Sequence, residues 1–263
     1  MSYWTLLAVS LIFSAVGFIG YVYFFSLGYG LSVAAIGAAL AIGFWQRLTA
    51  GTLAACMLLV IYGLRLAGYL LIREKRRPDY RKILSPEMER GKKIPLGFKA
   101  LMWAACAVLY TLETIPVYFR LKNNAAPDPL LYVGLGVSVC GLILETAADI
   151  QKSAAKKKAP GTYVSTGLYR WVRCPNYLGE LIFWLGVLLH GAGALRGPGQ
   201  WIPALMGYAL IVYVMFSGAR RLELRQMRTY GSDPVFQTYA HRVPILIPFI
   251  PLYSLEKYKW LMA

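Results

Sequence analysis

The chain has 263 residues, of which 58% are hydrophobic and only 15% are charged, and its mean hydropathy is +0.51. A soluble domain needs a polar surface, so this composition excludes an ordinary water-soluble protein. The formal net charge is +16, but the basic residues form short runs between long apolar stretches. That pattern favours membrane topology and contact with anionic lipid over nucleic-acid binding.

Seven apolar stretches approach or exceed the length of about 20 residues that a helix needs to cross a bilayer. They are residues 4–27, 31–46, 48–72, 98–119, 129–148, 178–195 and 201–218. The sequence therefore predicts an all-α, polytopic membrane helix bundle of about seven transmembrane helices, in a single membrane domain over 1–263. We expect residues 1–97 to supply the substrate-side helices and first cytosolic loop. Residues 98–263 are expected to form a cofactor-binding half with a basic tail.

The basic residues also predict how the bundle is oriented. With the N-terminus outside, 22 of the 28 Lys and Arg residues fall in inside segments and only four in outside segments. The positive-inside rule then places the C-terminus in the cytoplasm, and five spans would give the same sidedness. No glycosylation or retention signal stands out, which favours a bacterial inner membrane over the endoplasmic reticulum. We also expect a monomer.

Polar residues within the third apolar stretch share one helix face, namely Tyr62, Arg65 and Tyr69. Arg65 either extends its charge to the nearby cytoplasmic surface or turns it inward toward a polar ligand. Four cysteines and two histidines show no metal-ligand spacing, so we expect no metal site.

A second polar cluster follows the fifth stretch. Glu145 and Asp149 are one helical turn apart, which is typical of either a solvated helix end or a ligand pocket. The segment GLYRWVRCPNYLGE then places Arg173, Asn176 and Glu180 at the start of the next spanning helix. Polar groups at that depth are tolerated only in a protein interior or a cavity, and a helix N-terminus preceded by arginines favours an anion.

A third cluster lies in the basic tail, whose arginines either rest on anionic lipid or bind phosphates through their guanidinium groups. Its members are Arg220, Arg221, Glu223, Arg225, Tyr230 and Tyr239. Because all three clusters fall on the cytoplasmic side, they predict one pocket for an anionic cofactor. Soluble nucleotide motifs of the GxGxxG and Walker A types are absent from the sequence.

From Tyr62 onward the chain resembles the steroid 5-alpha-reductase family, in particular its bacterial branch of membrane reductases. The resemblance is carried by YGLRLAGYLLIREKRRPDYR at 62–81, by ETAADIQK at 145–152 with GLYRWVRCPNYLGELIFW at 167–184, and by RRLELRQMRTYGSDPVFQTYAHRVPILIPF at 220–249. The last stretch is also similar to the tail of sterol C14-reductases. Isoprenylcysteine methyltransferases share a turn like PNYLGE, but ETAADIQK favours the reductases.

The resemblance implies NADPH as the cofactor. It implies that Asn176 and Glu180 contact the nicotinamide end, with Asp149 and Tyr163 as further contacts. It also implies that tail arginines hold the adenosine phosphates, for which Arg220, Arg221 and Arg225 are candidates. Arg65, Arg173, Glu223, Tyr230 and Tyr239 are expected to complete the cofactor pocket.

By the same resemblance, Tyr62 acts on the substrate carbonyl. Steroid-reducing members place a glutamate from an early helix beside that tyrosine, yet this chain has no Asp or Glu before Glu74. Either Gln46 or Tyr62 alone takes that role, or the substrate is not a 3-oxo-4-ene steroid. Cys174 is a milder deviation, at a position where the motif usually has a histidine or a small residue.

The leading hypothesis is NADPH-dependent reduction of a carbon–carbon double bond conjugated to a carbonyl, in a lipid or steroid-like molecule that enters from the bilayer. One alternative is an S-adenosylmethionine-dependent lipid or isoprenylcysteine-type methyltransferase. A second alternative is a non-enzymatic sterol or lipid binder that retains the fold.

Overall fold

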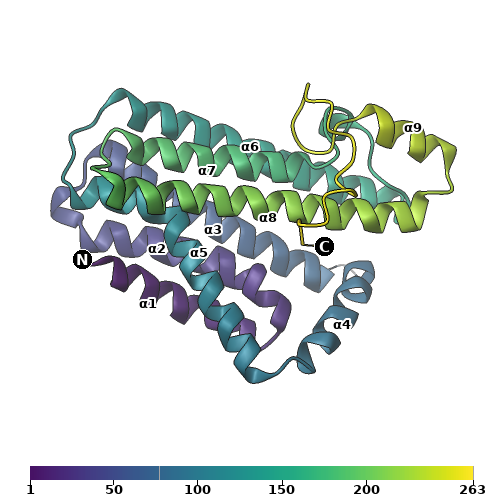
Figure 1. The fold of residues 1–263 in the computed structure, drawn as a ribbon, viewed down its shortest axis with the longest axis horizontal. Helices are drawn as coiled ribbons and strands as arrows, with labels where there is room; N and C mark the ends of the chain where they lie inside the picture. Colours follow the sequence, from purple (N-terminus) through teal and green to yellow (C-terminus); the bar gives the residue numbers. More distant parts are fainter. Residues whose placement is uncertain (77, 263) are drawn as a thin grey trace. The chain divides into compact units, whose positions relative to one another are not determined.

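The computed structural model describes residues 1–76 and 78–262, and every regular element within those ranges is helical. This confirms the predicted all-α class. The α-helices are α1 (Tyr3–Ser14), α2 (Leu27–Gly43), α3 (Ala50–Arg76), α4 (Pro78–Lys92), α5 (Leu96–Lys122), α6 (Pro129–Lys158), α7 (Pro175–Ala192), α8 (Pro198–Tyr230) and α9 (Pro234–Arg242) (Figure 1). The 3₁₀ helices are η1 (Ala15–Phe18), η2 (Tyr21–Phe25), η3 (Trp45–Arg47) and η4 (Gly167–Arg170).

Five segments among the described residues are long and apolar enough to cross a membrane. Four of them are α3, α5, α6 and α8, and the fifth joins η2 to α2 over Tyr21–Gly43. The N-terminal helix is shorter, and α7 begins with polar residues. These helices support an integral membrane protein, while the predicted count of seven spans is approximate.

The prediction of one continuous helix over residues 4–27 is wrong. α1 ends at Ser14, and η1 and η2 follow before α2 begins. Two glycines explain the break. Gly20 has extended backbone angles, φ −154° and ψ 121°, and the ring of Phe24 occupies the space where a side chain on Gly17 would lie.

The chain folds as two compact units. The first unit comprises residues 1–136 and 186–208, and the second comprises residues 137–185 and 209–263. Helices α6, α7 and α8 contribute residues to both units.

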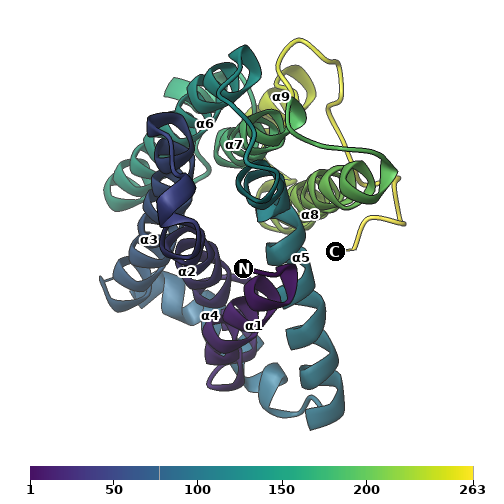
Figure 2. The same cartoon turned by 90° about the vertical axis from the view of Figure 1, so that its left-hand side faces the viewer.

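In the first unit, α2 packs against α3 and also against α1 and α5 (Figure 2). The α2–α3 contact is close because glycines meet there. A Cβ atom on Gly63 would lie 2.2 Å from the carbonyl oxygen of Gly30, and one on Gly37 would lie 2.8 Å from that of Cys56. Small residues of this kind let helix backbones touch, which is how helices associate in lipid.

The first unit also buries Arg120 at the C-terminal end of α5. Its guanidinium donates to the carboxylate of Asp128 and to the carbonyls of His190 and Ala126. The neighbouring Asn123 donates to the carbonyl of Ala194 at 2.8 Å. A buried charge is tolerated when it is paired and hydrogen-bonded in this way, so this end of α5 is a satisfied polar cap.

In the second unit, α6, α7 and α8 run side by side (Figure 1). α6 and α7 meet at two glycines. A Cβ atom on Gly141 would lie 2.3 Å from the amide nitrogen of Phe183, and one on Gly179 would lie 2.5 Å from that of Glu145. On the other side of α7, the ring of Tyr177 lies against Gly218 of α8.

The Gly63→Ala variant tests the α2–α3 contact. The added methyl group has no space, so the helices must separate, and we expect a loss of about 1–3 kcal/mol of stability. The measurement is the thermal unfolding midpoint of the detergent-purified protein.

Gly68→Ala is the matched control on the same helix, since a Cβ atom at Gly68 has no neighbour within 4 Å. It should leave the midpoint unchanged or raise it, because alanine favours a helix over glycine by up to about 1 kcal/mol. Equal midpoints for the two variants would contradict the proposed packing.

Candidate functional site

Five charged side chains are buried in the second unit, among the residues that the structure describes. They come from α6, from the segment that leads into α7, from α7 itself and from α8. They are Glu145, Asp149, Arg173, Glu180 and Glu223. Ionisable groups buried in a membrane helix bundle mark a functional site by default. All five fall in the clusters that the sequence predicted.

The glycine contact between α6 and α7 positions two of these carboxylates. Gly179 lies against the backbone of Glu145, and Glu180 is the next residue on α7. One turn after Glu145, the hydroxyl of Tyr169 donates to the carbonyl oxygen of Ala148 at 3.2 Å, which fixes the loop beside Asp149. The structure therefore brings Glu145, Glu180 and Asp149 to neighbouring parts of the α6–α7 contact.

Arg173 and Glu223 form a buried ion pair. The Arg173 Nη2 atom lies 3.1 Å from Glu223 Oε1, with side chains only 2% and 5% exposed. The same nitrogen donates to the carbonyl of Tyr253, and Glu223 Oε2 accepts from the amide of Leu255 at 2.8 Å. Both charges are thus matched within the protein, and together they hold the C-terminal segment against α8.

Main-chain hydrogen bonds extend this attachment to the residues just before α7. The amides of Arg173 and Cys174 donate to the carbonyls of Pro244 and Ile245, each at 2.9 Å. Burial raises the pKa of the Cys174 thiol to about 11. The thiol is therefore protonated at neutral pH and packs as a small apolar group rather than acting as a nucleophile.

Asn176, at the start of α7, is one of the site residues with a buried polar atom that has no hydrogen-bond partner among residues 1–76 and 78–262, as is Arg173 through its Nε atom. In Asn176 this atom is the side-chain oxygen. A buried acceptor left unpaired costs about 1–3 kcal/mol, so a ligand that brings a donor would be favoured there. Asn176 therefore offers an acceptor to a ligand, and its contact with a nicotinamide cofactor stays a prediction.

The three tail arginines predicted to bind phosphates differ in their surroundings. Arg221 and Arg225 are exposed on α8, and both lie near enough to Tyr177 to interact with its hydroxyl electrostatically. Arg220 instead donates to the carbonyls of Glu256 and Leu261 in the C-terminal segment, at 3.1–3.4 Å. Two of the three guanidinium groups are therefore available to an anion from solvent.

The predicted tyrosines form one aromatic cluster with Phe236. Tyr163 stacks on Tyr239 with ring centroids 5.5 Å apart, and Tyr230 and Phe236 lie 5.6 Å apart. The Tyr239 hydroxyl donates to the carbonyl of Tyr169 at 2.7 Å, which docks α9 onto the loop. Burial raises the pKa of both Tyr163 and Tyr239, and the carboxylate of Asp233 raises that of Tyr163 further.

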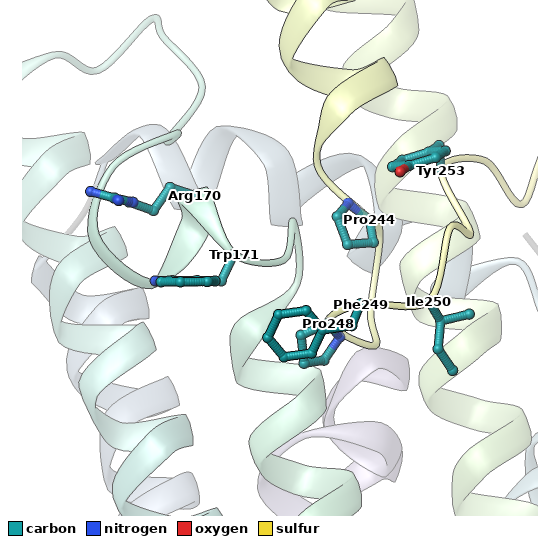
Figure 3. Close-up of a pocket in the computed structure, with 7 residues that line it drawn as sticks. All are labelled: Arg170, Trp171, Pro244, Pro248, Phe249, Ile250 and Tyr253. Atoms are coloured by element: carbon teal, nitrogen blue, oxygen red, sulfur yellow. The ribbon is translucent and has the colours of Figure 1, made fainter.

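A cavity of about 250 Å³ opens beside this loop (Figure 3). Trp171 and Phe249 meet edge to face with centroids 6.4 Å apart, and the Arg170 guanidinium lies 5.7 Å from the Trp171 ring. The remaining lining residues are Pro244, Pro248, Ile250 and Tyr253. Of these seven, only Arg170 belongs to the polar cluster predicted around the start of α7. The other six were not predicted, because the cavity forms only when the C-terminal segment folds back on the loop.

In the first unit, the predicted catalytic Tyr62 is fully buried on α3, and its hydroxyl lies 3.2 Å from that of Tyr29 on α2. Arg65 lies one turn further along α3, 5.9 Å from the ring of Tyr69. Gln46 is exposed in η3, before α3 begins. Since Tyr62 is twelve residues into that helix, about 18 Å along its axis, the structure places Tyr29 beside Tyr62 and not Gln46.

Sequence reasoning missed Tyr29, although a signal was present. Tyr29 and Tyr62 each precede a glycine, Gly30 and Gly63, and these glycines form the α2–α3 contact. If the glycines of the two apolar stretches had been assumed to face each other, the two tyrosines would have been predicted to lie side by side.

The fold and the site define a polytopic, all-helical membrane protein with a buried charged site in its second unit. The chain belongs to the family described as "Protein of unknown function (DUF1295)", whose model matches residues 25–243. This supports the resemblance to the steroid 5-alpha-reductase family in general, while the bacterial branch stays a prediction.

Two curated relatives are similar to the chain. A "Very-long-chain enoyl-CoA reductase" of Dictyostelium discoideum is 27% identical over 154 residues, which cover 56% of this chain and 44% of that protein. An uncharacterized protein of Schizosaccharomyces pombe is 31% identical over 84 residues, which cover 32% of this chain and 23% of that protein. The chain thus spans less than half the length of either relative. No solved structure matches it.

The Glu223→Gln variant tests the buried ion pair. Glutamine keeps an acceptor for the Leu255 amide but leaves Arg173 buried without a countercharge, and breaking such a pair costs about 3–5 kcal/mol. We expect a lower thermal midpoint in ligand-free protein. Glu256→Gln is the control, since it neutralises an exposed carboxylate of the same segment; similar midpoints for both variants would argue against the pair's structural role.

Proposed function

We propose that this protein is a membrane reductase that saturates a carbon–carbon double bond conjugated to a carbonyl in a lipid or steroid-like substrate, with NADPH as the hydride donor. The observation that carries the proposal is the buried, unpaired oxygen of Asn176 at the start of α7, on a helix whose neighbour α8 exposes Arg221 and Arg225. The name of the Dictyostelium relative supports a reductase acting on acyl lipids.

The residues of the second unit fit the parts of this cofactor. Asn176 would accept from the carboxamide of the nicotinamide, and Arg221 and Arg225 would bind phosphate oxygens through their planar guanidinium groups. When bound, NADPH supplies a hydride. Several of the remaining predicted cofactor contacts also hold the protein together. These predicted contacts are Arg65 of the first unit and Asp149, Tyr163, Arg173, Glu180, Arg220, Glu223, Tyr230 and Tyr239 of the second.

The catalytic proton donor of the proposal is Tyr62. When a hydride adds to the β-carbon, negative charge develops on the carbonyl oxygen, and a hydroxyl proton directed at that oxygen stabilises the transition state. Tyr62 is fully buried, so water does not compete for its proton. A donor of this kind contributes about 2.7–4 kcal/mol, or roughly 10²–10³ in kcat.

The proposed substrate class is supported by the membrane helices and by the comparison with reductases. Five apolar segments suit an enzyme whose substrate partitions into lipid. The relative's name favours an enoyl thioester. A 3-oxo-4-ene steroid would require Tyr62 to act without the early carboxylate that steroid-reducing members use. We place the cofactor residues on the cytoplasmic side, where NADPH is available.

Ligand binding provides the first test. We expect NADPH to raise the thermal midpoint of the purified protein, because a ligand that binds only the folded state stabilises it by about 2.7 kcal/mol at 100 times its Kd. NADH, which lacks the 2′-phosphate, should stabilise less. Asn176→Ala should reduce the NADPH shift. Stabilisation by S-adenosylmethionine and not by NADPH would instead favour a methyltransferase.

The second test is Tyr62→Phe, assayed by NADPH oxidation with a long-chain 2-enoyl-CoA and with a 3-oxo-4-ene steroid. We expect kcat to fall by roughly 10²–10³ because the proton donor is lost. The NADPH-induced thermal shift should persist. Unchanged turnover would remove Tyr62 from the mechanism.

A further inference from the structure

We infer that Tyr29 is a positioning residue for Tyr62, donating a hydrogen bond to the Tyr62 hydroxyl oxygen and so directing the Tyr62 proton toward the substrate. This inference rests on the proposed function and adds a residue to its catalytic site.

The geometry of the two hydroxyls is the starting point. Their oxygens are 3.2 Å apart, and the residues are 6% and 0% exposed. The rings meet edge to face, with centroids 6.1 Å apart and an angle of 72° between their planes. Two phenol groups that hydrogen-bond in an apolar interior interact more strongly than they would in water, since the local dielectric is low.

The contact between the α2 and α3 backbones restrains the Tyr29–Tyr62 pair. Gly30 and Gly63 directly follow the two tyrosines, and a Cβ atom on Gly30 would lie 2.7 Å from the carbonyl oxygen of Gly63. With the two helices in contact at this point, neither tyrosine can move apart from the other by sliding its helix. The distance between the hydroxyls is therefore set by helix packing.

A third tyrosine holds the ring of Tyr29. Tyr110 of α5 stacks on it with centroids 4.8 Å apart and planes 29° from parallel. The Tyr110 hydroxyl donates to the carbonyl of Phe24 at 2.6 Å, which anchors this ring in turn. Tyr29 is thus held in place before any substrate arrives, which is the condition for a preorganised donor.

The chemistry gives the hydrogen bond a direction. A tyrosine hydroxyl carries one proton and can also accept. If Tyr62 directs its proton at the substrate oxygen, the bond between the tyrosines must be donated by Tyr29. As the Tyr62 proton leaves, its oxygen gains negative charge, and a hydrogen bond to a charged acceptor is roughly twice as strong as a neutral one. The bond therefore stabilises the transition state more than the ground state.

The experiment is Tyr29→Phe in the full chain, assayed with NADPH and the two substrates named above. Loss of one charge-assisted hydrogen bond predicts a fall in kcat of roughly 10- to 100-fold. The KM of the lipid substrate and the NADPH-induced thermal shift should stay within about twofold of wild type, and the persisting shift shows that the variant folds.

A double-mutant cycle separates positioning from a structural effect. If Tyr29 acts through Tyr62, then Tyr29→Phe should cause no further loss in the Tyr62→Phe background, since the two residues act as one unit. Tyr118→Phe is the matched control on α5. It keeps a fully buried ring and removes a hydroxyl that contacts the carbonyl of Met1 at 3.4 Å, so it should leave kcat within about twofold.

Two results would overturn the inference in different ways. If Tyr62→Phe is impaired but Tyr29→Phe is not, or if the two losses multiply, the role of Tyr29 is wrong and the proposed function stands. If wild-type protein neither binds NADPH nor turns over either substrate, the proposed function fails, and the role of Tyr29 fails with it.

Discussion

Contact between helix backbones at glycine positions determines where the polar side chains of this protein lie. Lipid is as apolar as a leucine side chain, so membrane helices associate through close packing and hydrogen bonds rather than through the hydrophobic effect. Gly63 against Gly30 brings Tyr62 and Tyr29 together, and Gly179 against Glu145 brings α7 and its Glu180 to α6. In both units, groups proposed for chemistry lie beside a close backbone contact at a glycine.

Charge balance inside the apolar bundle gives the second constraint. Arg173 is matched by Glu223, and Arg120 by Asp128, so both buried guanidinium groups have their countercharge within the protein. Asn176 contrasts with these pairs because its oxygen has no hydrogen-bond partner in the described part of the chain. The Asn176 oxygen and the exposed guanidinium groups of Arg221 and Arg225 are therefore the groups of the second unit that the proposed cofactor would use.

Hydropathy predicted α3, α5, α6 and α8 closely at their starts because long apolar runs have few alternatives to a helix in lipid. It predicted their ends less well. α6 and α8 continue through Lys158 and Tyr230, since charged residues leave the membrane without ending a helix. The polar clusters were readable from local spacing. The Arg173–Glu223 pair and the Tyr29–Tyr62 hydrogen bond could not be predicted from the sequence. Each joins residues that are distant in sequence, and each depends on which helix faces meet.

The C-terminal segment is attached to the rest of the second unit mainly through its main chain. The carbonyls of Pro244, Ile245 and Tyr253 and the amide of Leu255 make the bonds to the loop and to α8. This attachment requires only that most side chains of the C-terminal segment be apolar where they are buried. A segment held in this way can change its sequence while keeping its path, and the family match ends at residue 243, where this segment begins.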